Sequence, residues 1–309
     1  SGILTARGGM TSHAALVARG WGKCCIVGSE GIVIDFDKKI AKIGNKEFKE
    51  GDVISLNGSK GFVYEGEVKM ISPEDNPLFN RFMTIVDKYH TIGVATNADN
   101  HADTKQALDF GAKGIGLFRI EHMFYGKNSE APLAILRKMI LSKTTDERKK
   151  YLNELLPYMK DSVKGTLKVM DGKPVTIRLM DPPLHEFVPH TEDKQILLAK
   201  ELNITLEDLK ERIENLKEIN PMMGLRGVRL GIVYPEISEY QFKALFASEA
   251  EVRKEGFNPM LEIMIPLTIS VEELKHQKVI CDKVHSEVEK EKNTKIEYKY
   301  GTMIEVPRA

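Results

Sequence analysis

The stretch Gly114-Ile115-Gly116-Leu117-Phe118-Arg119 is a short apolar run that ends on a charged residue. Runs of the same kind recur along the chain, at residues 92–96, 175–180, 261–266 and 300–305. Segments with helical patterns separate them, including residues 104–110 and a stretch after Ala131. Short apolar strands separated by helices indicate a parallel sheet that is covered on both faces.

Polar or charged residues recur at or near the carboxyl ends of these runs, namely Asn97, Arg119, Arg178, Asp181 and Glu305. In a (β/α)8 barrel the active site is built at that end of the strands. The pattern therefore favours a barrel, and an open doubly wound sheet is the alternative. About five strands can be counted, so we expect the barrel to be incomplete.

A second informative stretch is Arg7-Gly8-Gly9-Met10-Thr11-Ser12-His13-Ala14-Ala15. The glycines allow a close backbone approach, and Thr11 and Ser12 are good N-cap residues for a helix that follows. The start of a helix offers free N–H groups and the positive end of the helix dipole. His13 at that place is a candidate carrier of a phosphoryl group. The alternative is a capped surface helix that contains a histidine.

The chain divides into three segments by pattern. Residues 1–71 form the end of a small α/β domain, because short apolar runs alternate there with Gly, Asp, Asn and Lys. Residues 72–90 form a linker that starts with Ser72-Pro73-Glu74-Asp75-Asn76-Pro77 and continues as a helix over 78–89. Residues 91–309 form the barrel portion. Within it, residues 191–220 are charged and helical, and Thr205 begins a capping-box pattern.

Composition narrows the class of protein further. The 309 residues are 42% hydrophobic and 29% charged, which is ordinary for a soluble domain. Lys plus Arg equal Asp plus Glu at 45 each, which argues against a nucleic-acid binder and a membrane-surface protein. The three cysteines form neither a disulfide framework nor a zinc motif, so we expect a reducing, cytoplasmic location. The chain lacks native-looking ends and is expected to be an internal piece, so targeting peptides are not visible.

Three arginines and one glutamate are candidates for binding an anionic substrate. Arg119, Arg178 and Arg226 each stand in a separate string, and the planar guanidinium suits both phosphate and carboxylate groups. Glu305 follows an apolar run and is a candidate Mg²⁺ ligand. Each residue taken alone is also consistent with a surface ion pair.

These strings together resemble the pyruvate phosphate dikinase family over essentially the whole chain. The resemblance rests on Gly9-Met-Thr-Ser-His13-Ala-Ala, Gly114-Ile-Gly-Leu-Phe-Arg119-Ile-Glu-His-Met-Phe, Arg178-Leu-Met-Asp-Pro-Pro-Leu-His-Glu-Phe, Asn220-Pro-Met-Met-Gly-Leu-Arg226-Gly and Met303-Ile-Glu305-Val-Pro-Arg. Phe118 and Ile120 depart from the commoner Cys and Thr, and we expect this to alter packing rather than chemistry.

The resemblance implies a role for each candidate. His13 is the phosphohistidine carrier, Arg119 and Arg178 bind the substrate phosphate, and Arg226 is a further site arginine. Glu305 is the first Mg²⁺ ligand and also contacts substrate. Asn97 is a weaker candidate that would contact substrate or support an arginine. The second metal ligand and the cysteine acid are expected beyond Ala309, so Cys281 is not assigned that role.

The implied activity interconverts ATP, phosphate and pyruvate with AMP, pyrophosphate and phosphoenolpyruvate. The implied fold is the C-terminal part of a swivelling phosphohistidine domain followed by an incomplete (β/α)8 barrel that binds phosphoenolpyruvate or pyruvate. ATP and AMP would bind a domain that precedes Ser1, the enzyme would be a homodimer, and this piece alone is expected to be inactive.

Two other families carry a similar histidine. They are phosphoenolpyruvate synthase and enzyme I of the sugar phosphotransferase system, and both usually have Arg where this chain has Met10. A further hypothesis concerns Thr11, since plant dikinases are switched off by phosphorylation of a threonine two residues before the histidine. A regulatory kinase and phosphatase would then be partners, because a phosphate on Thr11 would repel one on His13.

Overall fold

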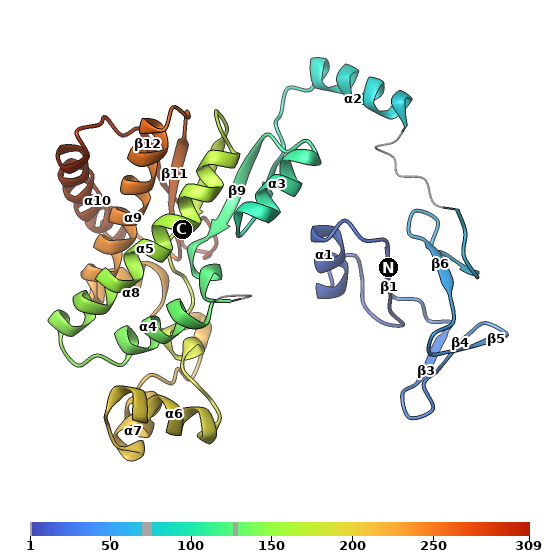
Figure 1. Ribbon diagram of the computed structural model, residues 1–309, viewed down its shortest axis with the longest axis horizontal. Helices are drawn as coiled ribbons and strands as arrows, with labels where there is room; N and C mark the ends of the chain where they lie inside the picture. Colours follow the sequence, from blue (N-terminus) through green and yellow to red (C-terminus); the bar gives the residue numbers. More distant parts are fainter. Residues whose placement is uncertain (1, 70–75, 126–128) are drawn as a thin grey trace. The chain divides into compact units, whose positions relative to one another are not determined.

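The computed structural model describes residues 2–69, 76–125 and 129–309, and the chain divides into two compact units, Ser1–Thr91 and Ile92–Ala309 (Figure 1). Each unit has its own secondary structure and is described by itself. Most of the linker string expected to begin at Ser72 lies outside the described residues. No described helix has the length and apolar character that crossing a membrane requires.

The second unit is built on a five-stranded sheet in which every neighbouring pair is parallel. The strands, in spatial order, are β8 (Ala95–Asn97), β9 (Gly114–Arg119), β10 (Pro174–Arg178), β11 (Met260–Ile265) and β12 (Tyr298–Thr302). The spatial order equals the chain order, without the reversal that marks a doubly wound sheet. The prediction of an α/β fold with a parallel sheet is confirmed, and the sequential order is that of a (β/α)8 barrel.

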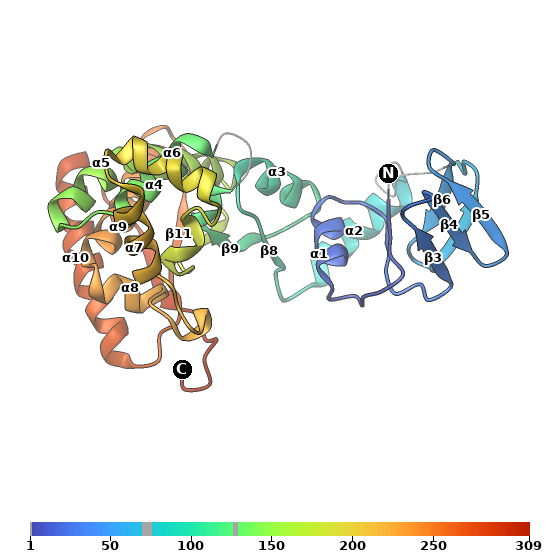
Figure 2. The same cartoon turned by 90° about the horizontal axis from the view of Figure 1, so that it is seen from below.

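Helices connect the strands and cover the sheet. They are α3 (His101–Asp109), α4 (Glu130–Ile140), α5 (Thr145–Val169), α6 (Glu192–Leu202), α7 (Leu206–Asn215), α8 (Gly227–Val233), α9 (Pro235–Lys254) and α10 (Val271–Lys292), with short 3₁₀ turns η2 (Ile120–Phe124), η3 (Leu184–Phe187) and η4 (Pro221–Met223). Helix α9 packs against both α5 and α10 (Figure 2). The strands contribute Phe118, Ile177 and Ile263 to the core, and α9 contributes Phe242 and Leu245, all almost fully buried.

The boundaries of these helices follow from side-chain caps. Thr144 and Glu147 form a reciprocal capping box at the start of α5, and Ser270 and Glu273 form one at the start of α10. The expected box at Thr205 is half formed, because its hydroxyl accepts from Asp208 N–H and no return bond accompanies it among the described contacts. The charged stretch after residue 191 is helical, as predicted.

Two strand predictions need correction. The first run was expected as a buried strand over 92–96, but β8 covers only Ala95–Asn97, and Ile92 and Val94 are 81% and 71% exposed. Among the described strands β8 pairs only with β9, so β8 is an edge strand and has no second neighbouring strand in the sheet. The last run was expected to end at Glu305, but β12 ends at Thr302. The next donor on the partner side, the Leu267 N–H just after β11, bonds to the Glu305 carboxylate and not to a backbone carbonyl of the last run.

The first unit is built from short strands and two helices. They are β1 (Ile3–Leu4), α1 (His13–Gly20), β2 (Cys25–Ile26), β3 (Ile32–Asp35), β4 (Ile40–Ile43), β5 (Lys46–Lys49), β6 (Ile54–Asn57), β7 (Phe62–Glu65) and α2 (Pro77–Tyr89). Strands β1 and β2 are parallel, β3-β4-β5 form an antiparallel meander, and β6-β7 form a hairpin. Strands β4 and β5 were not predicted, because lysines and a glutamate break up their few apolar residues. The predicted helix over 78–89 is confirmed, and Pro77 begins it.

Candidate functional site

Two of the candidate arginines are direct neighbours in the sheet. Arg119 is the last residue of β9 and Arg178 is the last residue of β10, and their Cα atoms are paired in register. Parallel strands present their carboxyl ends at one edge, so side chains from two distant strings meet there. The sheet therefore places these two arginines on neighbouring strands at its carboxyl edge.

Arg178 is buried and held by two carboxylates. Its Nη2 bonds to Oε1 of Glu121, and its Nη1 lies 3.0 Å from Oδ2 of Asp181. Nε of Arg178 and Oε2 of Glu121 are buried without a hydrogen-bond partner among the described residues. An unpaired buried donor on an arginine is costly, and a ligand at this edge could supply the missing acceptor.

Arg226 joins the same cluster from another part of the chain. It is the N-cap residue of α8, and its Nη2 lies 2.6 Å from Oδ2 of Asp181. Its Nε also approaches the backbone carbonyl of Asp181 at 3.2 Å, and Gly227 donates its N–H to that carbonyl. Asp181 thus bridges two arginines and fixes the loop after β10 to the start of α8.

Arg119 is oriented by a carboxylate of its own. Oδ1 of Asp99 accepts from the Arg119 backbone N–H at 3.1 Å, and Oδ2 lies 3.2 Å from Nη1. Nδ1 of His122 lies 3.0 Å from the same Oδ2. Burial alone would raise the pKa of Asp99, but the hydrogen bond from His122, together with the hydrogen bond and charge of Arg119, lowers it overall. Nε and Nη2 of Arg119 have no partner in the described part of the chain and remain open to an anion.

The pKa of Glu121 is shifted in the opposite direction to that of Asp99. Burial raises its pKa, and the charge of Arg178 offsets only part of that shift. Sequence reasoning did not select Asp99, Glu121 or His122 as site residues, and it noted Asp181 only as a strand-end carboxylate. The signal that was available is position, since each lies within a few residues of the carboxyl end of a strand.

Two further candidates lie at this edge in a looser arrangement. Asn97 ends β8 as expected, but it is exposed, and no hydrogen bond joins its side chain to an arginine among the described contacts. The residue that supports an arginine here is Asp99, which lies in the loop just after β8. Glu305 is exposed, and its Oε1 accepts from the backbone N–H of Leu267 at 2.8 Å. This bond ties Glu305 to the chain just after β11, at the carboxyl edge.

Glu305 is the candidate ligand for a metal ion at this edge. Residues 2–69, 76–125 and 129–309 contain no group of three or more His, Cys, Asp or Glu side chains arranged to hold a metal ion. Glu305 is a single exposed carboxylate, and one of its oxygens is engaged by Leu267. Mg²⁺ in phosphate chemistry is often held by one or two carboxylates together with substrate phosphate and water. Glu305 therefore fits as one ligand of such an ion but does not form a site alone.

His13 lies in the first unit, at the start of a helix and close to backbone N–H groups. It is the first residue of α1 and is exposed, and the Ser12 hydroxyl accepts from Ala15 N–H at 3.4 Å. The backbone N–H groups of His13 and Ala14 have no partner among the described residues, so they are available to an anion. Thr11 is exposed immediately before this cap. The predicted helix start with a hydroxyl cap is confirmed.

The glycine-rich loop before His13 is fixed by a close backbone approach. Gly8 has φ of +109°, which favours glycine. A Cβ on Gly28 would lie 2.5 Å from the carbonyl oxygen of Gly8, so no larger residue fits there without moving the loop. Ser29 also donates its N–H to the carbonyl of Thr5. The segment after β2 therefore holds the loop that precedes the histidine.

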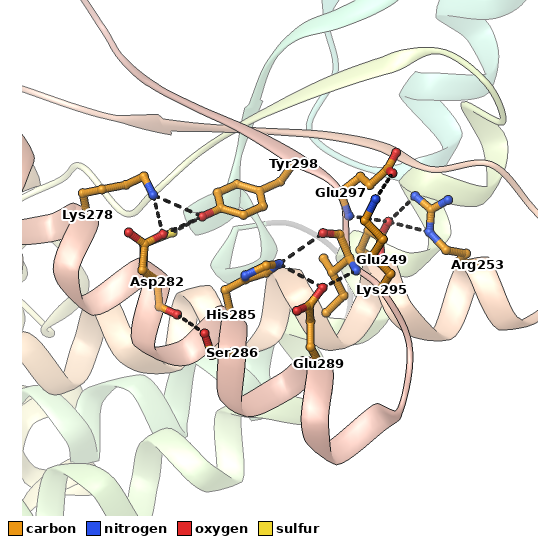
Figure 3. Close-up of polar contacts among 12 residues, drawn as sticks. Glu249, Arg253, Lys278, Asp282, His285, Ser286, Glu289, Lys295, Glu297 and Tyr298 are labelled. Carbon is orange, nitrogen blue, oxygen red and sulfur yellow. Dashed lines mark hydrogen bonds and ion pairs between the residues drawn. The ribbon is translucent and has the colours of Figure 1, made fainter.

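Another polar cluster lies at the opposite end of the sheet (Figure 3). Tyr298, the first residue of β12, donates its O–H to Asp282 at 3.0 Å, and Lys278 bonds the same carboxylate. Cys281 on α10 is fully buried beside Tyr298, and burial raises the pKa of its thiol to about 12. A thiol in that state is a poor proton donor, and it lies at the amino end of the sheet. This agrees with leaving Cys281 out of the site.

Comparison with known proteins identifies the class. Residues 74–309 match the family described as PEP-utilising enzyme, PEP-binding domain, and residues 1–61 match PEP-utilising enzyme, mobile domain. The chain belongs to the PEP-utilising enzyme family.

Within that family, the chain is similar to several enzymes that share the name pyruvate, phosphate dikinase. It is 48% identical over its full length to pyruvate, phosphate dikinase of Giardia intestinalis and 47% identical to that of Clostridium symbiosum. It is also 47% identical to pyruvate, phosphate dikinase 1, chloroplastic, of Arabidopsis thaliana. The chain spans 34%, 35% and 32% of these relatives, about a third of their length.

Proposed function

We propose that this chain supplies the phosphohistidine carrier and the phosphoenolpyruvate site of a pyruvate phosphate dikinase. The whole enzyme would interconvert ATP, phosphate and pyruvate with AMP, pyrophosphate and phosphoenolpyruvate. The observation that carries the proposal is the convergence of Arg119, Arg178 and Arg226 at the carboxyl edge of the sheet. The similarity of this whole chain to part of the enzymes of that name supports the proposal.

The proposed chemistry is phosphoryl transfer between substrate and His13. Arg119 and Arg178 grip the phosphate of phosphoenolpyruvate, and Arg226 stabilises the anionic substrate beside them. An imidazole nitrogen of His13 attacks phosphorus, a P–N bond forms, and the bond between phosphorus and the enol oxygen breaks. The electron pair leaves with that oxygen as pyruvate enolate, which a proton donor then converts to pyruvate. The arginines stabilise charge on the transferring oxygens.

Glu305 is proposed as a substrate-side residue and as the Mg²⁺ ligand from this chain. A bound Mg²⁺ supplies positive charge to the substrate and to the developing enolate. The backbone N–H of Leu267 orients the Glu305 carboxylate at the edge where the arginines lie. Asn97 is proposed as a substrate contact, because its side chain is exposed at the end of β8, at the carboxyl edge of the sheet.

The proposed domain organisation is a carrier at residues 1–71, a linker at 72–90 and a substrate-binding barrel portion at 91–309. His13 would have to reach two active sites, so we place the swivel near residues 72–80. A nucleotide-binding domain outside this chain would supply ATP and AMP. The enzyme is proposed to be a homodimer in the cytoplasm.

Thr11 is proposed as a regulatory phosphosite for a kinase and a phosphatase. It is exposed next to the cap of α1, so a phosphate there would meet the same free N–H groups as a phosphate on His13. A Thr11→Glu enzyme should phosphorylate His13 at least tenfold more slowly, by roughly the strength of a charge repulsion, whereas Thr11→Ser should behave normally. An unchanged rate in Thr11→Glu would remove Thr11 from the scheme.

The function is tested with the full-length protein and phosphoenolpyruvate that carries a labelled phosphate. After labelling in the presence of Mg²⁺, AMP is added together with either pyrophosphate or phosphate. Label that enters ATP only with pyrophosphate supports the dikinase. Label that enters ATP with phosphate in place of pyrophosphate indicates phosphoenolpyruvate synthase, and label that passes only to a protein acceptor indicates a phosphocarrier like enzyme I.

A further inference from the structure

Each arginine of the cluster at the carboxyl edge is already paired with an acid before any ligand binds. Its three arginines face three carboxylates, on Asp99, Glu121 and Asp181. A phosphate ester brings a charge of about −2 at neutral pH, and a substrate carboxylate adds to it. Three arginines already paired with acids leave part of that charge uncompensated, and a cation, a proton or both can offset it.

His122 is the group in the cluster that is placed to take up a proton. Its Nδ1 lies 3.0 Å from Oδ2 of Asp99, the same oxygen that Nη1 of Arg119 approaches at 3.2 Å. The imidazole and the guanidinium are therefore side by side on one carboxylate oxygen. The His122 side chain is 39% exposed, and its Nε2 has no partner within the described ranges.

The orientation of the His122 ring is fixed from two sides. Asp99 accepts from Nδ1, which places a hydrogen on that nitrogen and leaves Nε2 as the open atom. The ring of Tyr125 contacts the imidazole edge to face at 5.9 Å, and Tyr125 in turn stacks on Phe187 at 5.7 Å. Nε2 accepts a hydrogen bond when the ring is neutral and donates one when the ring is protonated. Only the protonated ring can donate to a phosphate oxygen.

We propose that His122 is a phosphate-binding residue that takes a proton from solvent at Nε2 when phosphoenolpyruvate enters the arginine cluster. The proposal rests on the proposed function, because it assumes that this cluster is the phosphoenolpyruvate site. No covalent bond between heavy atoms changes in this step, and the proton returns to solvent when the anion leaves. Asp99 has a double role, since it orients both Arg119 and the imidazole.

Several charged groups face His122 and have to be considered in its pH behaviour. Asp99 contacts it from the loop after β8, Arg119 on β9 shares that carboxylate oxygen, and Glu121 precedes it on η2. Tyr125 packs on the ring, and Glu186 on η3 acts on Tyr125. Glu121 is the rival proton acceptor, because it is buried beside Arg178 with one oxygen unpaired.

The test measures proton uptake on binding. Full-length protein carrying His13→Ala binds phosphoenolpyruvate without consuming it, and calorimetry in buffers of different ionisation enthalpy gives the number of protons taken up. The comparison includes His122→Gln, which keeps a donor toward Asp99, and Glu121→Gln. His90→Gln is the matched control, since His90 on the first unit also faces an aspartate through Nδ1, Asp87 at 3.7 Å.

The expected result is uptake in the parent protein and in His90→Gln, and its loss in His122→Gln. Affinity for phosphoenolpyruvate should fall about tenfold in His122→Gln near pH 6.5, the strength of a hydrogen bond to a charged group, and the difference should shrink as pH rises. Unchanged uptake in His122→Gln, or uptake lost only in Glu121→Gln, would overturn the inference while binding itself upholds the proposed function. Failure of the parent protein to bind phosphoenolpyruvate would overturn both.

Discussion

Both ends of the parallel sheet carry clusters of basic and acidic side chains, but the clusters differ in how completely their polar atoms are paired. At the carboxyl end, Arg178 keeps a buried Nε without a partner and Arg119 has two open nitrogens among the described residues. At the amino end, Lys278, Asp282 and Tyr298 bond to one another in a closed cluster (Figure 3). An unpaired buried arginine donor at the strand ends where active sites are built favours a ligand there, whereas a closed polar cluster favours a contribution to stability. The difference separates the proposed active site from the supporting end of the same sheet.

The largest expected effect comes from replacing Arg178 with lysine. Lysine keeps the charge but loses the planar fork that contacts Glu121 and Asp181, so it cannot hold a phosphate in the same geometry. We expect transfer of phosphate from phosphoenolpyruvate to fall about a hundredfold or more, as when one transition-state donor is removed. Rapid-quench labelling of the full-length protein measures it. A loss below threefold would show that the carboxyl edge does not bind the reacting phosphate.

A matched pair of aspartates sharpens the comparison. Asp181→Asn should lower kcat/KM for phosphoenolpyruvate about tenfold, since this carboxylate positions both Arg178 and Arg226 through charge-assisted bonds. Asp282→Asn at the amino end should leave kcat/KM within about twofold and lower stability by less than about 1 kcal/mol. Steady-state kinetics and denaturant unfolding of both variants provide the readouts. Equal kinetic effects would break the distinction between the two ends.

Tyr298→Phe is expected to affect stability and not activity. The substitution removes the hydroxyl that bonds Asp282 and contacts Cys281 while keeping the ring against Phe246. Unfolding should become easier by about 1 kcal/mol, the usual contribution of one hydrogen bond. Denaturant titration measures this change. Reduced turnover at unchanged stability would instead connect the amino end to catalysis.

The smallest expected effect is on the acid side of the stability profile. Burial raises the pKa of Asp282, but hydrogen bonds from Lys278 and Tyr298 lower it overall from its ordinary value of 3.8. Because the folded-state pKa is depressed, this contribution is complete above about pH 3.8 and is lost as pH falls further. Asp282→Asn should therefore show a slightly shallower loss of stability below pH 4. A profile that parallels the parent protein through that range would argue against the ion pair.

The sequence predicted those features of the parallel sheet that follow from the regular spacing of apolar residues. Apolar runs placed three of the five strands well, and strand ends predicted that Arg119 and Arg178 share one edge, because parallel strands align their carboxyl ends. The edge strand β8 was misjudged, since burial depends on neighbours that a local pattern does not reveal. Strand β12 was extended too far because the next ladder donor, the Leu267 N–H, bonds to the Glu305 side chain, which a local pattern does not reveal.

The supporting carboxylates could not be predicted with the same certainty. Which acid orients which arginine depends on loop conformation, and Asp99 and Glu121 lie outside regular strands. The close approach of Gly28 to Gly8 is also tertiary, since the two glycines lie twenty positions apart along the chain. Only the folded loop shows that the backbone, rather than a side chain, positions the segment before His13.

The most direct test of the account maps the phosphorylated residue. Full-length protein is treated with phosphoenolpyruvate and Mg²⁺, digested at alkaline pH to preserve phosphohistidine, and analysed by mass spectrometry. The account predicts a phosphate on His13, absent in His13→Ala, greatly reduced in Arg178→Lys and unchanged in Asp282→Asn. A phosphate on another residue, or equal labelling of His13 in Arg178→Lys, would contradict transfer from the arginine cluster to this histidine.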